Sequence, residues 1–265
     1  NEHILIYGDY DVDGTTSVAL MYSFLKNHTE NIRFYIPDRY TEGYGISEKG
    51  IEYAASIHCQ LIIALDCGIR ALNMANLSKK KGIDLIICDH HIPGSILPKA
   101  YAVLDPKRKD CRYPFKELSG CGVGFKLLQG FCLQHTLDLG SLFNYLDLVA
   151  VSIASDIVPM VGENRILAYF GMQKINSQPL KSLQALIDIA GIKAPISISD
   201  VVFYIGPRIN AAGRLRHAHE SVDLLISEDP VQLKDFAQRL NEVNKKRQNI
   251  DQTVTEEALR TIHEE

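Results

Sequence analysis

The sequence predicts an α/β fold in which a parallel β-sheet is flanked by helices and followed by a helical region. In roughly the first hundred residues, short apolar runs alternate with amphipathic stretches, the order expected of βαβ units. Further along, apolar residues recur at three-to-four spacing, which is typical of helices. The chain has 265 residues, of which 46% are hydrophobic, enough for one large domain or two small ones.

The elements of the first part can be assigned in order. Strands are expected at His3–Tyr7, Ile32–Pro37, Leu61–Leu65, Leu85–Cys88 and Tyr101–Leu104. Helices are expected at Thr15–Asn27, at Ser47–His58 with Ser47 as its cap, and at Leu72–Lys81 before Gly82. Because ligands bind at the carboxyl ends of the strands in such sheets, the loops that follow the strands are expected to meet.

Helices dominate the second part. They are expected at Gly122–His135, Leu142–Ser155, Arg165–Ile175, Leu180–Ala190 and Ser199–Ile205. The polar segment 230–265, with regularly spaced apolar residues, predicts one long and poorly buried helix. We therefore divide the chain into a domain over 1–229, with an α/β part (1–115) and a helical part (116–229), and a connecting helix over 230–265. We expect that helix to lead to a second domain outside this sequence.

Composition narrows the class of protein. The apolar runs are far shorter than the roughly 20 residues that cross a bilayer, and no secretory signal pattern is visible. The six cysteines form no Cys-x-x-Cys pair, and several lie in apolar segments, as reduced thiols do. The net charge of −4 is not that of a typical duplex-binding domain, although bound metal would neutralise some acids. We expect a cytoplasmic protein without membrane association.

Ionisable side chains follow three of the expected strands at the point where each strand ends. They are Asp9, Asp11 and Asp13 after the first strand, Asp66 after the third, and Asp89, His90 and His91 after the fourth. Carboxylates crowded at one sheet edge would take up protons unless a multivalent cation supplied positive charge. A histidine pair beside a carboxylate offers imidazole nitrogens to such a cation. The pattern predicts a site for more than one metal ion.

Each segment also has a simpler interpretation. The first acids resemble the start of a calcium-binding EF-hand loop, but Leu20 stands where that loop needs Glu, and a strand precedes it. A solvated acidic turn is another alternative there. Asp66 alone could form a turn or cap a helix, and the histidine pair alone could belong to a surface loop. The three segments together favour the metal site.

A further acid, Asp156, ends an expected apolar helix, where its charge opposes the helix dipole and invites a compensating ion. The glycine-rich stretch from Ser119 to Lys126 opens another helix, so that its backbone amides and Lys126 could cradle a phosphate. It matches neither a P-loop nor a dinucleotide-binding fingerprint.

The segment 206–214 is a second candidate for phosphate binding. Arg208, Asn210 and Arg214 lie in what we expect to be a tight loop, which would suit bidentate capture of phosphate oxygens. Ion pairing of the arginines with surface acids is the alternative.

Together these segments resemble the DHH phosphoesterase superfamily, whose namesake triplet stands here as Asp89-His90-His91. The segments 8–14, 64–68, 155–156 and above all 206–214 are similar to motifs of its RecJ family of single-strand-specific exonucleases. The resemblance runs through nearly the whole chain. It implies hydrolysis of phosphodiester bonds from 5′ to 3′ along single-stranded DNA, in DNA repair and recombination.

The resemblance also implies a core of two Mn²⁺ or Mg²⁺ ions and a role for each residue. Asp66 would bridge both ions, Asp9 would hold one, and the other would be held by Asp11, His90 and Asp156. His91 would face the scissile phosphate, while Asp89 and Asp13 would support the ligands. From their own chemistry, Arg208 and Arg214 would join His91 in neutralising charge on the phosphoryl oxygens, with Lys126 and Asn210 as further phosphate contacts. By ligand type alone Zn²⁺ is also possible. Some members have a histidine where this chain has Tyr7, so the first metal site is expected to be weaker.

The implied partner is single-stranded DNA, with contact to single-strand-binding protein through regions outside this sequence. Two alternatives remain. One is a small-molecule phosphoesterase acting on a cyclic dinucleotide, nanoRNA, a bisphosphonucleotide or pyrophosphate, and the other is a non-catalytic scaffold. The arginine-containing segment and the final helix favour a polymeric substrate. Tyr40, Tyr44 and Tyr113 are candidates for stacking on bases.

Overall fold

A computed structural model describes residues 2–215 and 218–264. Within them, five strands form one parallel sheet in the order β2-β1-β3-β4-β5. The strands are β1 (Ile4–Gly8), β2 (Ile32–Tyr35), β3 (Leu61–Leu65), β4 (Asp84–Cys88) and β5 (Ala102–Leu104). Each lies within one or two residues of its expected position, and the predicted α/β class is confirmed.

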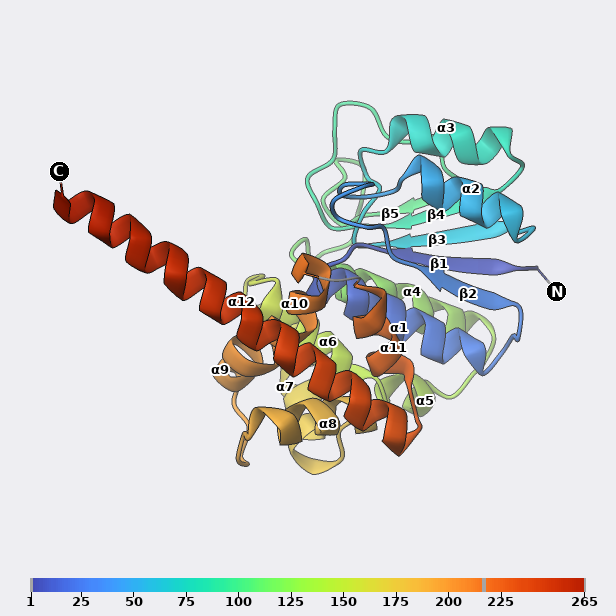
Figure 1. Cartoon of the computed structure of the whole chain (residues 1–265). Helices are drawn as coiled ribbons and strands as arrows, with labels where there is room; N and C mark the ends of the chain where they lie inside the picture. Colours follow the sequence, from blue (N-terminus) through green and yellow to red (C-terminus); the bar gives the residue numbers. More distant parts are fainter. Residues whose placement is uncertain (1, 216–217, 265) are drawn as a thin grey trace.

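Helices cover both faces of the sheet (Figure 1). One face carries α2 (Glu48–Ser56) and α3 (Leu72–Lys80), and the other carries α1 (Val12–Lys26) and α4 (Gly120–Gln134). Successive residues of a strand point to opposite faces, so Leu5 packs in the core under α2 and α3, whereas Ile6 packs in the core under α1 and α4. The central strands β1 and β3 are apolar throughout because both of their faces are buried, whereas β2 and β4 each include one exposed charged residue, Arg33 and Asp84.

The helical part packs onto the α1 and α4 face. Its elements are α5 (Leu139–Phe143), α6 (Leu146–Ser155), α7 (Gly162–Ser177), α8 (Lys181–Ala190), α9 (Ile198–Asp200), the π-helical turn η1 (Val201–Ile205), α10 (Gly206–Leu215) and α11 (His219–Ile226). Helix α6 lies at its centre, with every side chain from residue 147 to 153 buried. None of the described helices has the length and apolarity that a membrane span requires.

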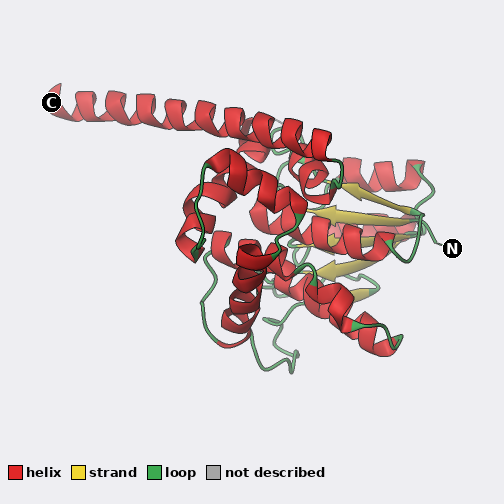
Figure 2. Ribbon diagram, turned by 90° about the horizontal axis from the view of Figure 1, so that it is seen from below, coloured by secondary structure: helices red, strands yellow, loops and turns green. Residues whose placement is uncertain are grey.

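The last helix, α12 (Pro230–Glu264), has two unlike halves. Leu233, Ala237 and Leu240 are buried in the first half, which packs against α8, α10 and α11. From residue 248 to 262 every side chain is exposed, and the helix projects away from the body of the molecule (Figures 1 and 2). The prediction of one long helix is confirmed, but one face of its first half is buried, because the apolar positions form a stripe that meets three helices.

Three local predictions were wrong. Helix α1 begins at Val12, so Asp13 and Gly14 lie in its first turn and not in a loop. The run expected as one helix over 142–155 is interrupted at residues 144–145, because a short helix capped by Asp138 ends at Phe143. The segment 206–214, expected as a tight loop, is helix α10, because Pro207 stands in the first turn, where proline is compatible with a helix.

Candidate metal centre

The acids at the sheet edge meet where the strand order reverses. In the sheet, β2 lies on one side of β1 and β3 lies on the other. The chain therefore turns in opposite directions after β1 and after β3, which opens a crevice beyond the ends of these two strands. Asp9 follows β1 directly and is 1% exposed. Asp66 follows β3 and is 2% exposed. Two carboxylates from different parts of the sequence are therefore buried side by side at this edge.

Two local features place these carboxylates. Asp66 has a φ of 59°, a left-handed conformation that costs energy in a residue with a side chain, and its N–H donates to the Cys88 carbonyl at 2.9 Å. Asp11 is the N-cap of α1 and accepts from the Gly14 amide at 3.0 Å. A Cβ on Gly14 would lie 2.4 Å from the Asp9 carbonyl oxygen, so only glycine allows the loop to turn this closely.

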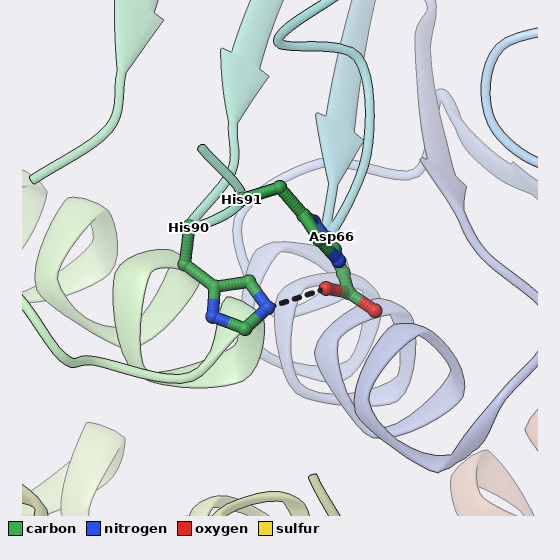
Figure 3. A group of neighbouring side chains, drawn as sticks. All are labelled: Asp66, His90 and His91. Carbon is green, nitrogen blue, oxygen red and sulfur yellow. Dashed lines mark ion pairs between the residues drawn. The ribbon is translucent and has the colours of Figure 1, made fainter. Parts of the chain in front are cut away.

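Three carboxylates converge on one nitrogen of His90. Its Nε2 lies 3.1 Å from Oδ1 of Asp66, 3.6 Å from Oδ2 of Asp13 and 3.6 Å from Oδ2 of Asp156. Figure 3 shows the His90 ring directed at the Asp66 carboxylate, with His91 beside it. Among the described residues, neither His90 Nε2 nor Asp66 Oδ1 has a partner with hydrogen-bond geometry. The ligand atoms therefore surround a common space and do not pair with one another.

Nitrogen and oxygen atoms form three overlapping groups, in each of which they lie within 4.8 Å of one another. The groups are Asp9 with Asp11 and Asp66, Asp13 with His90 and Asp156, and Asp66 with His90 and His91. Asp66 belongs to two groups, as a residue that bridges two ions would. Asp11 groups with Asp9 and Asp66, and Asp13 lies beside His90 and Asp156, so the assignment of Asp11 to the ion held by His90 stays a prediction.

Burial and mutual repulsion disfavour the charged forms of these acids. Desolvation, followed by the charge of Asp11, raises the pKa of Asp9 to about 7. Desolvation, followed by the charge of Asp13, raises the pKa of Asp156 to about 7 and raises that of Asp66 well above its usual range. In addition, Oδ1 of Asp9 is buried without a partner among the described residues. A divalent cation would satisfy these atoms and restore the charged carboxylates, so the donor set fits Mn²⁺ or Mg²⁺.

Asp13 differs from its neighbours because its carboxylate is already bound by the protein. It accepts from the backbone amides of Gly120 at 2.6 Å and Cys121 at 2.8 Å, and from the Ser152 hydroxyl at 2.7 Å. A Cβ on Gly120 would lie 2.6 Å from the Asp66 side chain. The start of α4 thus holds an acid of this cluster, and those two amides are not available for a substrate phosphate.

Asp89 orients the histidine pair. Its Oδ1 accepts from the backbone amides of His90 at 2.7 Å and His91 at 3.1 Å and lies 2.8 Å from Nδ1 of the His91 ring. Its Oδ2 accepts from the Ile69 amide at 2.8 Å. Burial tends to raise the pKa of Asp89, but its hydrogen bonds, led by the one with the His91 side chain, lower it. The same hydrogen bond raises the pKa of His91. Asp89 does not enter any ligand group, and it fixes the ring of His91, which is 46% exposed.

The sequence profile described as "DHH family, N-terminal domain" matches residues 3–153, more than half of the chain. The chain belongs to the DHH family. Two curated relatives are single-stranded-DNA-specific exonucleases named RecJ. The one from Bacillus subtilis is 40% identical over 266 residues, which is 100% of this chain and 33% of that protein. The one from Escherichia coli is 35% identical over 268 residues, which is 97% of this chain and 46% of that protein.

Solved structures agree with this family. An exonuclease RecJ bound to manganese is 30% identical and superposes with a TM-score of 0.89, covering 98% of this chain and 66% of that one. RecJ from Thermus thermophilus in complex with Mn²⁺ is 27% identical, with a TM-score of 0.85, covering 98% of this chain and 37% of that one. A further structure of the Thermus protein contains Mg²⁺. This DHH chain spans between a third and a half of the curated relatives that it matches.

Two predicted phosphate-binding residues, Lys126 and Arg208, contact residues outside the acid cluster. Lys126 Nζ is 3.1 Å from Oε1 of Glu163 and lies over the Tyr113 ring, 5.8 Å from its centroid, so the predicted pairing of Lys126 with a phosphate gains no support. Arg208, on α10, donates through Nε to Asn241 of α12 at 3.1 Å and through Nη1 to the Tyr204 carbonyl at 2.7 Å.

Helix α10 nevertheless runs beside the DHH centre. A Cβ on Gly206 would lie 2.7 Å from the Ser155 hydroxyl, next to Asp156, and one on Gly213 would lie 2.5 Å from the Tyr10 carbonyl oxygen. Asn210 is half-buried between them. The side chain of Arg214 lies outside the described part of the structure. The helix therefore borders the acid cluster from Ser155 to Tyr10.

Tyr7 supplies no ligand in place of the histidine that some DHH members carry. It is fully buried on the α2 side of the sheet, where its hydroxyl donates to the Gly45 carbonyl at 3.1 Å and accepts from the Ser47 amide at 3.0 Å. A Cβ on Gly50 would meet the Tyr7 ring at 2.4 Å. Tyr7 thus anchors the 45–50 segment to β1.

Two residues beside the DHH centre were not predicted there. Tyr44, expected only as a stacking candidate, donates to the Asp66 carbonyl at 3.1 Å and lies 3.3 Å from the His91 ring. Asp105 follows β5 and is 3% exposed, with Oδ2 unpartnered among the described residues. The same strand-end rule that identified Asp66 would have identified Asp105. No sequence pattern indicates the contacts of Tyr44, which come from a loop.

Proposed function

We propose that this chain is the metal-dependent catalytic core of an exonuclease that hydrolyses single-stranded DNA in the 5′-to-3′ direction. The observation that carries the proposal is the convergence of buried, unpartnered ligand atoms from Asp9, Asp66 and His90 at the strand edge. The names of the relatives supply the substrate, because the geometry by itself fits any phosphodiester. They favour a DNA strand over the small-molecule substrates that other DHH branches use.

The ligand groups would divide between two cations. Asp9, Asp11 and Asp66 would hold one ion, and His90, Asp156 and the shared Asp66 would hold the other, with Asp13 adding a carboxylate beside His90. Two such ions lower the pKa of water and neutralise charge on the phosphoryl group. The chain itself supplies the rigid frame, because Asp66 and Asp11 are fixed by backbone hydrogen bonds before any substrate arrives.

His91 acts on the substrate in this proposal. Its Nδ1 donates to the Asp89 carboxylate, which favours the imidazolium form of the ring, and in that form Nε2 also carries a proton and can donate a hydrogen bond to a phosphoryl oxygen. The Tyr44 hydroxyl contacts the same ring and limits its rotation. Arg208, Asn210 and Arg214 of α10 would contact the phosphates of the strand. Arg208 would do so with its guanidinium held by Asn241 and Tyr204.

The cellular setting follows from the same proposal. A nuclease of this kind would act in the cytoplasm, in DNA repair and recombination. Contact with single-strand-binding protein remains a prediction about segments outside this sequence, as does the second domain that would follow α12.

The direct test uses a single-stranded oligonucleotide with a 5′ phosphate and a label at either end, incubated with the protein and Mn²⁺. We expect stepwise loss of nucleotides from the 5′ end, little hydrolysis of the matching duplex, and no activity in EDTA. Cyclic dinucleotide and pyrophosphate serve as competing substrates. Faster turnover of either of them than of the DNA strand would reject the exonuclease assignment while keeping the metal centre.

A further inference from the structure

A cleft of about 680 Å³ opens beside His91, on the side of the DHH triplet that faces α3. Asp89 and His91 are among its lining residues, so the cleft adjoins the metal centre. Its other walls include Tyr44, Ile46, Arg70, Leu72, Asn73 and Ile92. No residue that we place in metal or phosphate binding lies on these walls beyond His91 and its support Asp89. The proposed function therefore leaves most of the cleft unassigned.

The walls have the chemistry of a site for a flat, partly polar group. Ile92 and Leu72 both line the cleft and are 68% and 36% exposed, so their aliphatic side chains offer accessible apolar surface there. Ile46 is buried at the cleft, and the Asn73 side chain supplies an amide. Apolar walls with a few fixed polar groups, enclosing 300–1,000 Å³, are typical of sites for small organic groups.

Arg70 adds a fixed positive charge to this cleft. Its Nε donates to the Ile92 carbonyl at 2.9 Å, which ties the guanidinium to the segment that follows the DHH triplet. Its two terminal nitrogens have no protein partner among the described residues. No acid of the cleft competes for them, because Asp89 is saturated by His91 and three backbone amides. An arginine held in this way is suited to an anion such as a phosphate.

We propose that this cleft receives the nucleoside joined to the scissile phosphate, and that Arg70 contacts the neighbouring phosphate of the same strand. The inference deepens the proposed function and rests on it. A nucleoside enters with its base between the apolar walls, where stacking and burial are independent of base identity. The cleft then explains how a strand of any sequence is held with its phosphate against His91.

The test fills the cleft and asks which base is affected. Asn73→Trp places a large ring in the cleft, and Asn76→Trp, on the exposed face of the same helix and outside the cleft, is the matched control. Single-turnover release of the first nucleotide is measured with Mn²⁺ on 5′-phosphorylated strands. One strand is intact, and the others carry an abasic residue at the first, second or third position. Mn²⁺ binding by calorimetry shows whether each variant keeps its metal centre.

We expect Asn73→Trp to lower kcat/KM on the intact strand about tenfold, the loss that follows from removing one base contact. For wild type, one abasic position lowers kcat/KM by a similar factor, and at that position Asn73→Trp causes no further loss. Asn76→Trp behaves as wild type on every strand. Arg70→Gln lowers affinity and reduces the slope of log affinity against log salt by about 0.7, the change for one single-strand phosphate contact.

Two results would overturn the inference while leaving the exonuclease proposal intact. One is equal activity of the Asn73→Trp and Asn76→Trp proteins on all strands, and the other is a loss in Asn73→Trp that is the same at every abasic position. A wild-type protein that binds Mn²⁺ but releases nucleotides from no strand gives a different pattern. It would remove the proposed function and this inference together.

Discussion

Among the described residues, aspartates are buried at the sheet edge and in α6, and Asp66 and Asp147 show how the surroundings of the carboxylate differ between these places. Asp147, in α6, is fully buried, but it accepts from the backbone amides of Leu148 at 3.0 Å and Leu180 at 2.8 Å, with Lys174 Nζ 3.7 Å away. Asp66 is equally inaccessible, and its nearest charged neighbours are other acids and His90. Burial raises the pKa of both, yet only Asp147 has donors that lower it again. A buried acid thus marks a metal site when the protein leaves it without donors.

The largest effect should come from Asp66→Asn, which removes the shared charge and almost nothing else. We expect hydrolysis of single-stranded DNA to fall by more than about 1,000-fold, since a two-ion centre loses its common ligand. Mn²⁺ binding in calorimetry should weaken at the same time. In EDTA the variant should melt at the same or a higher temperature than wild type, because an amide avoids the cost of burying an acid whose charged form is disfavoured by desolvation and by its acidic neighbours. Activity within tenfold of wild type would show that Asp66 holds no ion.

The same isosteric change at Asp147 should lower stability and leave Mn²⁺ binding unchanged, the opposite of the result expected at Asp66. Asp147→Asn turns one oxygen into an NH₂ group next to an amide that donates to it, and it removes the carboxylate charge beside Lys174, which keeps only its bond to the Gln178 carbonyl. We expect the free energy of unfolding, measured in urea, to fall by about 1–3 kcal/mol, the cost of leaving buried polar groups unpaired. Mn²⁺ affinity should stay as in wild type. If Asp147→Asn weakened Mn²⁺ binding as strongly as Asp66→Asn, the distinction between the two acids would not hold.

The pH dependence of stability sharpens the comparison further. In the folded chain without metal, the pKa values of Asp9 and Asp156 are raised to about 7, whereas unfolded aspartate titrates at about 3.9. Raised pKa values give a stability that is complete below about pH 4 and is lost as pH rises toward 7. With Mn²⁺ the loss should shrink or reverse, because the ion binds the deprotonated carboxylates. Melting curves from pH 5 to 8, in EDTA and in Mn²⁺, measure both trends, and a melting temperature in EDTA that rises over this range would contradict the account.

The strand-end ligands of the site can be predicted from the sequence, whereas the position of Asp13 cannot. The strand-end rule finds Asp9, Asp66 and His90, because apolar runs define where each buried strand stops. It does not find that Asp13 stands beside His90, since that depends on Gly120 and Ser152, more than a hundred residues away.

The segment 206–214 shows the second limit. It was expected to form a tight loop, but it is a helix in which Gly206 and Gly213 lie where α10 packs directly on Ser155 and Tyr10. That packing is tertiary and leaves no local pattern. Likewise the glycine-rich start of α4 holds Asp13, although the same composition would suit a phosphate.

The smallest effect is expected when the partner of a third kind of acid is removed. This acid, Glu163, is partly exposed and already paired. Glu163 is held by Lys126 at 3.1 Å and by the Tyr113 hydroxyl at 2.5 Å, and both members of the ion pair are about a third exposed or less. Lys126→Ala should therefore lower stability by less than about 1 kcal/mol, since solvent screens such pairs. Activity on single-stranded DNA should change by less than about twofold, because Lys126 is engaged away from the acid cluster. A tenfold rise in KM together with a shallower salt dependence would instead show that Lys126 leaves Glu163 to bind a phosphate, and it would restore the interpretation that its sequence first suggested.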